Sequence, residues 1–176
     1  MTTETGTVRI ALTNLGKYNE GSLVFKWLDL PYTDEDLQET LKAIGINEEY
    51  EEYFISDTDS DITGLTIGEY DDIEELNDLI TDYDNLDEWD RGKIAAIIES
   101  DSISLKEAME CVDEIELIPD VDNERDLGYY YVEDSGIYDT KSLGPLANYI
   151  DYESFGRDIQ LDKAGSFTSY GYVTRR

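Results

Sequence analysis

The sequence contains no histidine and a single cysteine, Cys111, among its 176 residues. The lack of histidine excludes the Ser-His-Asp triad, HExxH zinc proteases and most zinc sites. There is also no glycine-rich phosphate loop ending in Gly-Lys. A lone cysteine cannot form an intrachain disulfide, and we expect Cys111 to be a buried structural thiol. The sequence therefore predicts a protein that is not an enzyme and holds no metal and no cofactor.

Basic residues are scarce, because 13 Lys and Arg stand against 43 Asp and Glu, a formal net charge of −30. Residues 29–134 hold 36 acidic and 5 basic residues, whereas the flanking segments together balance at +1. The excess charge therefore belongs to the middle of the chain. Such a protein cannot hold phosphates through basic contacts, but it can bind proteins that do. We expect partners that are basic proteins and no nucleic acid.

Long apolar runs are also missing, since no segment approaches the roughly 18 apolar residues of a membrane span. The first ten residues lack the apolar stretch of a signal peptide. We therefore expect a soluble, cytoplasmic protein that does not associate with membranes. Aromatic residues make up 11% of the chain, which is unlike a disordered acidic tail, so the chain is expected to fold.

Apolar periodicity predicts mixed secondary structure. In the first third, residues 14–21 resemble a turn, Pro31 ends a strand, and Thr33 and Gly45 bracket a helix with Leu37, Leu41 and Ile44 inward. Alternation predicts strands at residues 7–13, 23–27, 50–56, 114–118, 127–132 and 166–174. A short helix is expected at residues 143–150.

The middle of the chain has helical periodicity. Asp71 or Asp72 is expected to cap one helix, Asp87 the next, and Ser104 with Glu107 forms a capping box for a third. The residues expected to face inward are Ile73, Leu76, Leu79, Ile80 and Tyr83, then Trp89, Ile94, Ile97 and Ile98, then Ala108, Met109 and Val112. The fold class is therefore α+β, with an α+β domain at 1–62, a helical domain at 63–110 and an α+β domain at 111–176.

The many carboxylates raise two further possibilities, a calcium site and acid–base catalysis. Asp57, Asp59 and Asp61 match the first ligands of an EF-hand loop, but Ile62 and Gly68 stand where that loop needs Gly and Glu. A specific calcium site is therefore not expected, although weak Ca²⁺ binding by an acidic protein remains an alternative. Pairs of carboxylates for acid–base catalysis are uninformative among 43 acids.

The acidic surface itself permits two interpretations. Acids three or four residues apart on a helix lie about 5–6 Å apart at Cβ, whereas duplex DNA carries one charge per roughly 1.7 Å of axis. A folded acidic body can thus approach the charge pattern of DNA. The simpler interpretation is a solvated face that maintains solubility, and charge alone favours it.

Four segments, in order along the chain, resemble the ArdA family of antirestriction proteins. They are Leu15-Gly16-Lys17-Tyr18-Asn19-Glu20-Gly21 followed by Trp27, Glu49–Tyr53, Ile67–Tyr70 leading into Ile73–Asn77, and Leu146–Asp158. The resemblance implies an antirestriction protein of mobile genetic elements, such as conjugative transposons, that mimics B-DNA. It would occupy the DNA-binding groove of type I restriction-modification enzymes, formed by the methyltransferase core with its specificity subunit, and inhibit restriction and modification.

The resemblance further implies an elongated chain of three small domains that forms a homodimer through its C-terminal domain. A DNA mimic aimed at another basic DNA-binding protein is the alternative that charge leaves open.

Two sets of residues are candidates for function. The carboxylates expected to replace phosphates are Asp34, Glu35, Glu39, Glu48, Glu51, Asp57, Asp59, Asp61, Glu69, Asp71, Asp72, Glu74, Glu75, Asp78, Asp82, Asp84, Asp87, Glu88 and Asp90. The residues of the last family motif, expected in the core or a dimer interface, are Tyr149, Asp151, Tyr152, Phe155, Gly156, Arg157 and Asp158.

Overall fold

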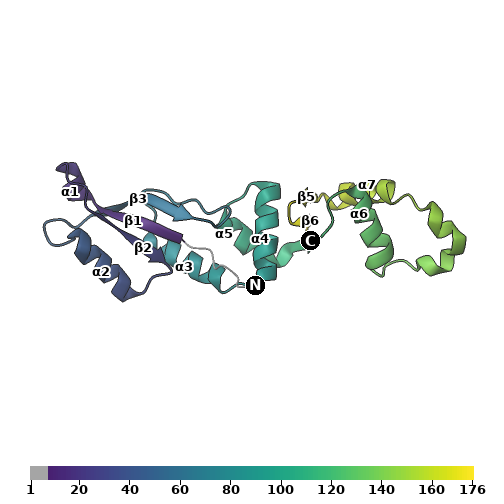
Figure 1. The fold of residues 1–176 in the computed structure, drawn as a ribbon, viewed down its shortest axis with the longest axis horizontal. Helices are drawn as coiled ribbons and strands as arrows, with labels where there is room; N and C mark the ends of the chain where they lie inside the picture. Colours follow the sequence, from purple (N-terminus) through teal and green to yellow (C-terminus); the bar gives the residue numbers. More distant parts are fainter. Residues whose placement is uncertain (1–7) are drawn as a thin grey trace. The chain divides into compact units, whose positions relative to one another are not determined.

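A computed structural model describes residues 8–176 (Figure 1). Its contacts divide the chain into two compact units, and the boundary along the sequence falls between Asp87 and Glu88. Each unit contains one three-stranded antiparallel sheet and several helices, which agrees with the predicted α+β class. The division into three domains stays a prediction, and the first seven residues of its first domain lie outside the described residues.

The N-terminal unit is a sheet of order β2-β1-β3 with helices α2 and α3 against one face. Its elements are β1 (Val8–Asn14), α1 (Leu15–Asn19), β2 (Phe25–Leu30), α2 (Asp34–Ile44), β3 (Tyr53–Ser60) and α3 (Ile73–Asp84). Because side chains alternate along a strand, Val8, Ile10 and Leu12 of β1 share one face, and all three are buried. The strand predicted at 7–13 is thus confirmed over residues 8–13 and continues to Asn14, and Thr7 lies outside the described residues.

Helix α2 begins and ends where its sequence predicts. The Thr33 hydroxyl accepts a hydrogen bond from the Asp36 amide, while the Asp36 carboxylate accepts one from the Thr33 amide. Gly45 ends the helix in the left-handed conformation at φ 79°, which glycine adopts without a Cβ penalty. Ile44 is fully buried as expected, whereas Leu37 and Leu41 are half-buried.

The segment expected to be a turn at residues 14–21 instead contains the short helix α1. Asn14 explains the difference, because its buried side chain accepts a hydrogen bond from the Lys17 amide and donates one to the Ile44 carbonyl. This side chain both caps α1 and fixes it to the end of α2. The capping bond itself is local, whereas the bond to Ile44 joins residues thirty positions apart.

The strand predicted at residues 23–27 is found at Phe25–Leu30, and the alternating apolar residues that indicated it do not form its buried side. Leu23 and Phe25 are exposed to 63% and 47%, and Trp27 is half-buried. The buried residues of β2 are Leu28 and Leu30, because the register sets Leu28 opposite the buried Ile10. Directly opposed residues share a face of the sheet, so the other alternating set of β2 faces outward.

The C-terminal unit has a second sheet, of order β4-β6-β5. Its elements are α4 (Glu88–Asp101), α5 (Leu105–Glu110), the 3-10 turn Val112–Glu114, β4 (Ile115–Ile118), α6 (Glu124–Tyr129), the π-helical turn Tyr130–Asp134, the 3-10 segment Thr140–Tyr149, α7 (Tyr152–Lys163), β5 (Ser166–Thr168) and β6 (Gly171–Arg175).

Several predictions for the helices of both units are confirmed. Asp72 caps α3, and Ser104 and Glu107 form the capping box of α5. The inward residues of α3 are Ile73, Leu76 and Ile80, with Leu79 and Tyr83 half-buried. In α4, the predicted Ile94, Ile97 and Ile98 are buried.

Trp89 was wrongly predicted to face inward, since it lies in the first turn of α4 and is half exposed. Cys111 ends α5 and is half-buried rather than buried.

Two strands of the last third were wrongly predicted. Residues 127–132 are helical, and Leu127 and Tyr131, four residues apart, are buried together. A short run rich in aromatic residues does not distinguish helix from strand by periodicity. Residues 166–174 form a hairpin of two strands, β5 and β6, rather than one. The predicted helix at 143–150 is a 3-10 segment ending at Tyr149.

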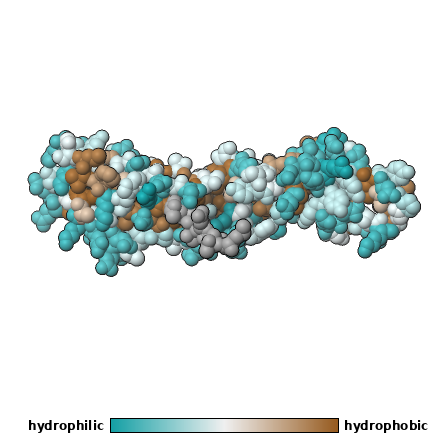
Figure 2. Space-filling model, viewed as in Figure 1, coloured by the Kyte–Doolittle hydropathy of each residue, from teal (hydrophilic) through white to brown (hydrophobic). Residues whose placement is uncertain are grey.

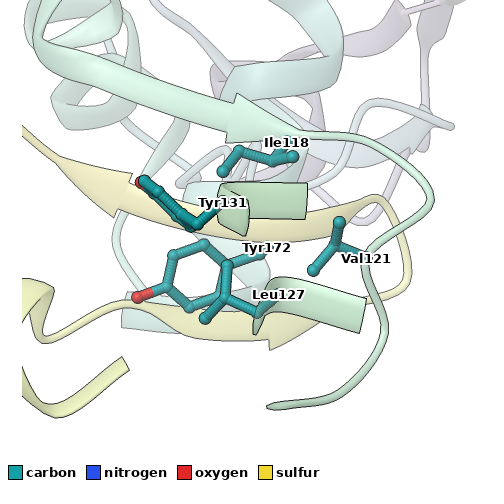
Figure 3. Close-up of a cluster of buried hydrophobic side chains, with 5 residues drawn as sticks. All are labelled: Ile118, Val121, Leu127, Tyr131 and Tyr172. Atoms are coloured by element: carbon teal, nitrogen blue, oxygen red, sulfur yellow. The ribbon is translucent and has the colours of Figure 1, made fainter. Parts of the chain in front are cut away.

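Helices α6 and α7 pack on the second sheet around a cluster of Ile118, Val121, Leu127, Tyr131 and Tyr172 (Figure 3). The two tyrosine rings are the largest members of this core. Burial raises the pKa of Tyr131 to about 12, with the nearby Glu116 carboxylate adding to the effect. Among residues 8–176, no helix is both long and apolar enough to cross a bilayer.

Two glycines let α6 and α7 approach backbone to backbone. A Cβ added to Gly128 would lie 1.8 Å from the Tyr152 carbonyl oxygen, and one added to Gly156 would lie 1.7 Å from the Glu124 carbonyl oxygen. Neither contact can be relieved by rotating a side chain, because each partner is backbone. Any other residue at these positions must push the helices apart.

We predict that Gly156→Ala lowers the free energy of unfolding by about 3 kcal/mol, because the added methyl group overpacks this crossing. Gly92→Ala is the matched control, since Gly92 lies inside helix α4 and its added Cβ would meet only the Leu117 side chain at 3.9 Å. That control should raise the free energy of unfolding by up to about 1 kcal/mol. Urea denaturation of both variants measures the difference, and equal effects would contradict the close helix crossing.

Candidate protein-binding surface

The nineteen carboxylates selected from the sequence lie on the surface of the structure. All are exposed except Asp84 and Asp90, which are half-buried. Figure 2 accordingly shows hydrophilic residues over much of the visible surface. Exposure leaves these groups accessible to a cationic partner.

Helix α3 illustrates how the fold orders these charges. Its buried face holds Ile73, Leu76 and Ile80. Glu74, Asp78 and Asp82 follow one another at four-residue steps and are exposed, so they form a row along the opposite side. The acidic row is therefore fixed by the same periodicity that buries the apolar face.

Some of the selected carboxylates already have partners within the chain. Asp59 forms an ion pair with Arg9 at 2.7 Å, and Asp90 forms one with Lys93 at 2.6 Å. Asp72 accepts hydrogen bonds from the first amides of α3, and Asp71 accepts one from the Gly68 amide at 2.7 Å. Asp59 and Asp90 are thus compensated locally by a neighbouring cation and offer less charge to a partner.

Hydrogen bonds hold several surface carboxyl groups in the ionised form. Bonds from Ser104 lower the pKa of Glu107, and bonds from Ser169 lower the pKa of Glu99. The pKa of Asp36 falls through its bonds with Thr33, and that of Asp151 through its bonds with Ser154. Asp36 and Glu107 are the capping-box partners of an N-cap residue, and Asp151 is itself an N-cap. The same side chains therefore cap helices and contribute surface charge.

The set chosen from the sequence missed exposed acids of the C-terminal unit. It stopped at Asp90, yet Asp113, Glu114, Asp120 and Asp122 are all exposed. The charge map of residues 29–134 contained the signal, because the acidic excess continues well past Asp90. The acids of this part of the chain are set in turns and 3-10 structure rather than in a regular helix, so no periodic pattern marked them.

The residues of the last family motif have distinct positions. Asp151 caps α7, the Tyr152 hydroxyl donates to Glu133 at 2.7 Å, and Phe155 packs against the core cluster. Gly156 forms the close crossing with α6. Arg157 and Asp158 are exposed on α7, and Tyr149 is 84% exposed.

The EF-hand-like run adopts a structure unsuited to a calcium loop. Asp57 and Asp59 lie on strand β3, and Asp61 follows its end. An extended strand separates alternate side chains along its length instead of wrapping them around an ion. Within residues 8–176, no group of three or more Cys, Asp or Glu side chains is placed to hold a metal ion.

The fold and the exposed carboxylates define an acidic protein of mixed helix and sheet whose surface suits basic partners. Residues 10–174 match the profile of the family described as Antirestriction protein (ArdA). The match spans nearly the whole chain, so the protein belongs to the ArdA family of antirestriction proteins, as the sequence resemblance predicted. This family inhibits restriction and is not known as an enzyme family. No match is found among curated proteins.

We predict that Ser104→Ala raises the pKa of Glu107 toward its ordinary value, because the hydroxyl that stabilises the carboxylate is lost. The folded-state pKa is the depressed one, so the stability from this cap is present above the unfolded pKa and is lost as pH falls through the folded pKa. Carboxyl titration by NMR measures the shift. Glu99, held by Ser169, is the internal control and should titrate unchanged; an unshifted Glu107 would contradict the capping-box assignment.

Proposed function

We propose that the protein inhibits type I restriction-modification enzymes by presenting its carboxylates as substitutes for DNA phosphates. The target would be the DNA-binding groove of the methyltransferase core with its specificity subunit, in the cytoplasm where incoming DNA is cleaved. Family membership supports an antirestriction role. The observation that carries the mechanism is that the selected carboxylates are almost all exposed and form ordered rows such as that of α3.

The physical basis of the proposal is competition for the same basic groups. A groove that binds DNA aligns Lys and Arg side chains with phosphates, and much of its affinity comes from releasing counterions. A protein polyanion offers an equivalent charge to those side chains. Its binding should therefore weaken steeply as salt rises, as DNA binding does.

The spacing of the charges indicates that many carboxylates must act together. Successive acids of the α3 row are about 6 Å apart along the helix axis, whereas one DNA strand carries a phosphate every 3.4 Å. One helical row is therefore too sparse to imitate a duplex. Exposed acids of α2, β3 and the connecting loops have to supplement it, so no single carboxylate is expected to decide the affinity.

We predict that neutralising four acids of α3, by Glu74→Gln, Glu75→Gln, Asp78→Asn and Asp82→Asn, weakens inhibition at least tenfold. The matched control is the variant with Asp113→Asn, Glu114→Gln, Asp120→Asn and Asp122→Asn, which changes the net charge equally. Competition between the protein and labelled duplex for a type I methyltransferase core, at low and moderate salt, measures both. Any single one of the eight substitutions should change the affinity by about twofold or less.

Equal losses in the two quadruple variants would show that net charge, rather than the α3 surface, determines inhibition. A salt-independent affinity of the unaltered protein would contradict the electrostatic mechanism altogether.

We also propose a homodimer formed through the C-terminal unit. The 3-10 segment Thr140–Tyr149 has no buried residue, although it contains Leu143, Leu146 and Tyr149, all exposed. Tyr138, just before it, is half exposed. Solvent-exposed apolar residues grouped in one segment are typical of association surfaces, and a second copy of the chain would remove them from water.

We predict that Leu146→Asp reduces the dimer to a monomer, because a charge is placed in the proposed contact. Leu161→Asp is the control, since Leu161 is also exposed but lies on α7 outside the segment. Sedimentation equilibrium measures the mass of each variant. A dimer that survives Leu146→Asp, or that Leu161→Asp disrupts equally, would place the interface elsewhere.

A further inference from the structure

The outer face of the N-terminal sheet, opposite α2 and α3, is only partly covered. The register places Phe25 of β2 and Phe54 of β3 on either side of Thr13, so the three share this face. Tyr18 of α1 meets the Phe54 ring edge-on, with 5.3 Å between centroids, and Phe54 is buried. Helix α1 thus covers the β3 side of this row and leaves Phe25 open to solvent.

Further apolar side chains extend this open area. Leu23 lies two residues before Phe25, the first residue of β2, and is the most exposed of the group, while Trp27 lies on the same face as Phe25 by strand alternation. Tyr18, Leu23, Phe25 and Trp27 are here called the aromatic patch. Figure 2 shows hydrophobic residues gathered at the end of the molecule where Figure 1 draws α1 and the adjoining strand ends.

Trp27 is held in place by its neighbours. The Arg9 guanidinium lies 4.9 Å from the centre of the Trp27 ring, and it is fixed in turn by two hydrogen bonds to Asp59. An aromatic side chain ordered before binding loses little conformational freedom on association. Tryptophan and tyrosine in such positions are the residues that most often dominate the binding energy of protein interfaces.

The charges on the same sheet face define what the patch can bind. The register places Asp29 and Asp59 beside Arg9, and Asp57 beside Ala11. With Arg9 paired to Asp59, the face keeps a formal balance of −2. An aromatic centre with a polar border is the pattern of an interface core and rim. Because this border is acidic, its complement is an apolar area bordered by lysine or arginine.

We propose that the aromatic patch is an apolar anchor that docks on such a surface of the restriction-modification enzyme beside its DNA-binding groove. This inference rests on the proposed function and adds to it a contact that DNA itself cannot make. The carboxylates provide affinity that salt screens, whereas burial of the patch provides affinity that salt hardly changes. The two contributions are therefore separable by experiment.

The test compares two double variants of the full chain. Leu23→Ala with Phe25→Ala removes the centre of the patch, and Leu161→Ala with Tyr170→Ala removes a similar pair of exposed side chains from the C-terminal unit. Calorimetry measures binding of each to a purified type I methyltransferase core at low, moderate and high salt. The patch variant should bind about 30-fold more weakly at every salt, with an unchanged salt slope, and the control within about twofold of the unaltered protein.

Each other outcome has a definite meaning. If the unaltered protein does not bind the core, the proposed function and the anchor both fail. If it binds and the two double variants are equal, or if the patch variant changes the salt slope instead, only the anchor is overturned. A lower mass of the patch variant in sedimentation would assign the patch to a second copy of the chain and likewise overturn it. The single variant Leu23→Ala, at a position outside the strands, repeats the test should the double variant lose its fold.

Discussion

Electrostatic repulsion among 43 acidic residues is the constraint to which the rest of this structure responds. A formal charge of −30 on a chain of this size opposes compaction at every helix and strand. Acids are therefore placed at the ends of helices where the backbone itself stabilises them. Helices α2, α3, α4, α5, α6 and α7 all carry acidic residues in their first turns, near the positive end of the helix dipole and its free amides.

Close packing between α6 and α7 contributes to the stability of a small unit. Each unit is of fewer than a hundred residues, and domains of this size bury a smaller share of their surface than large ones. The C-terminal unit compensates with backbone contact at Gly128 and Gly156 and with two tyrosine rings in one core. Such contacts add dispersion energy without adding chain length, and they make this crossing sensitive to a single methyl group.

Local rules predicted the parts of the fold that local chemistry determines. The Thr33 and Ser104 caps, the Gly45 stop and the apolar stripe of α3 follow from side chains within a few residues of each other. The errors came where a distant partner decides. The buried side of β2 is set by its register with Ile10, Asn14 of the α1 cap also bonds Ile44, and the helical residues 124–129 pack against α7. Exposed carboxylates were the simplest part of the site to predict, since ionised groups avoid burial, but the pairing of Asp59 with Arg9, fifty residues away, required the tertiary structure.

The exposed apolar side of β2 is the feature of the fold with the largest consequence for function. A surface made only of carboxylates would attract every strongly basic groove, because long-range electrostatics steers association with any surface of opposite charge. Discrimination needs short-range contacts that depend on shape, and apolar side chains supply them without competing for the same ions. Exposing Phe25 and Leu23 costs the free protein favourable burial. This cost matters because the free energy of unfolding of a folded protein is small. That cost is consistent with the aromatic patch being retained for binding rather than for folding.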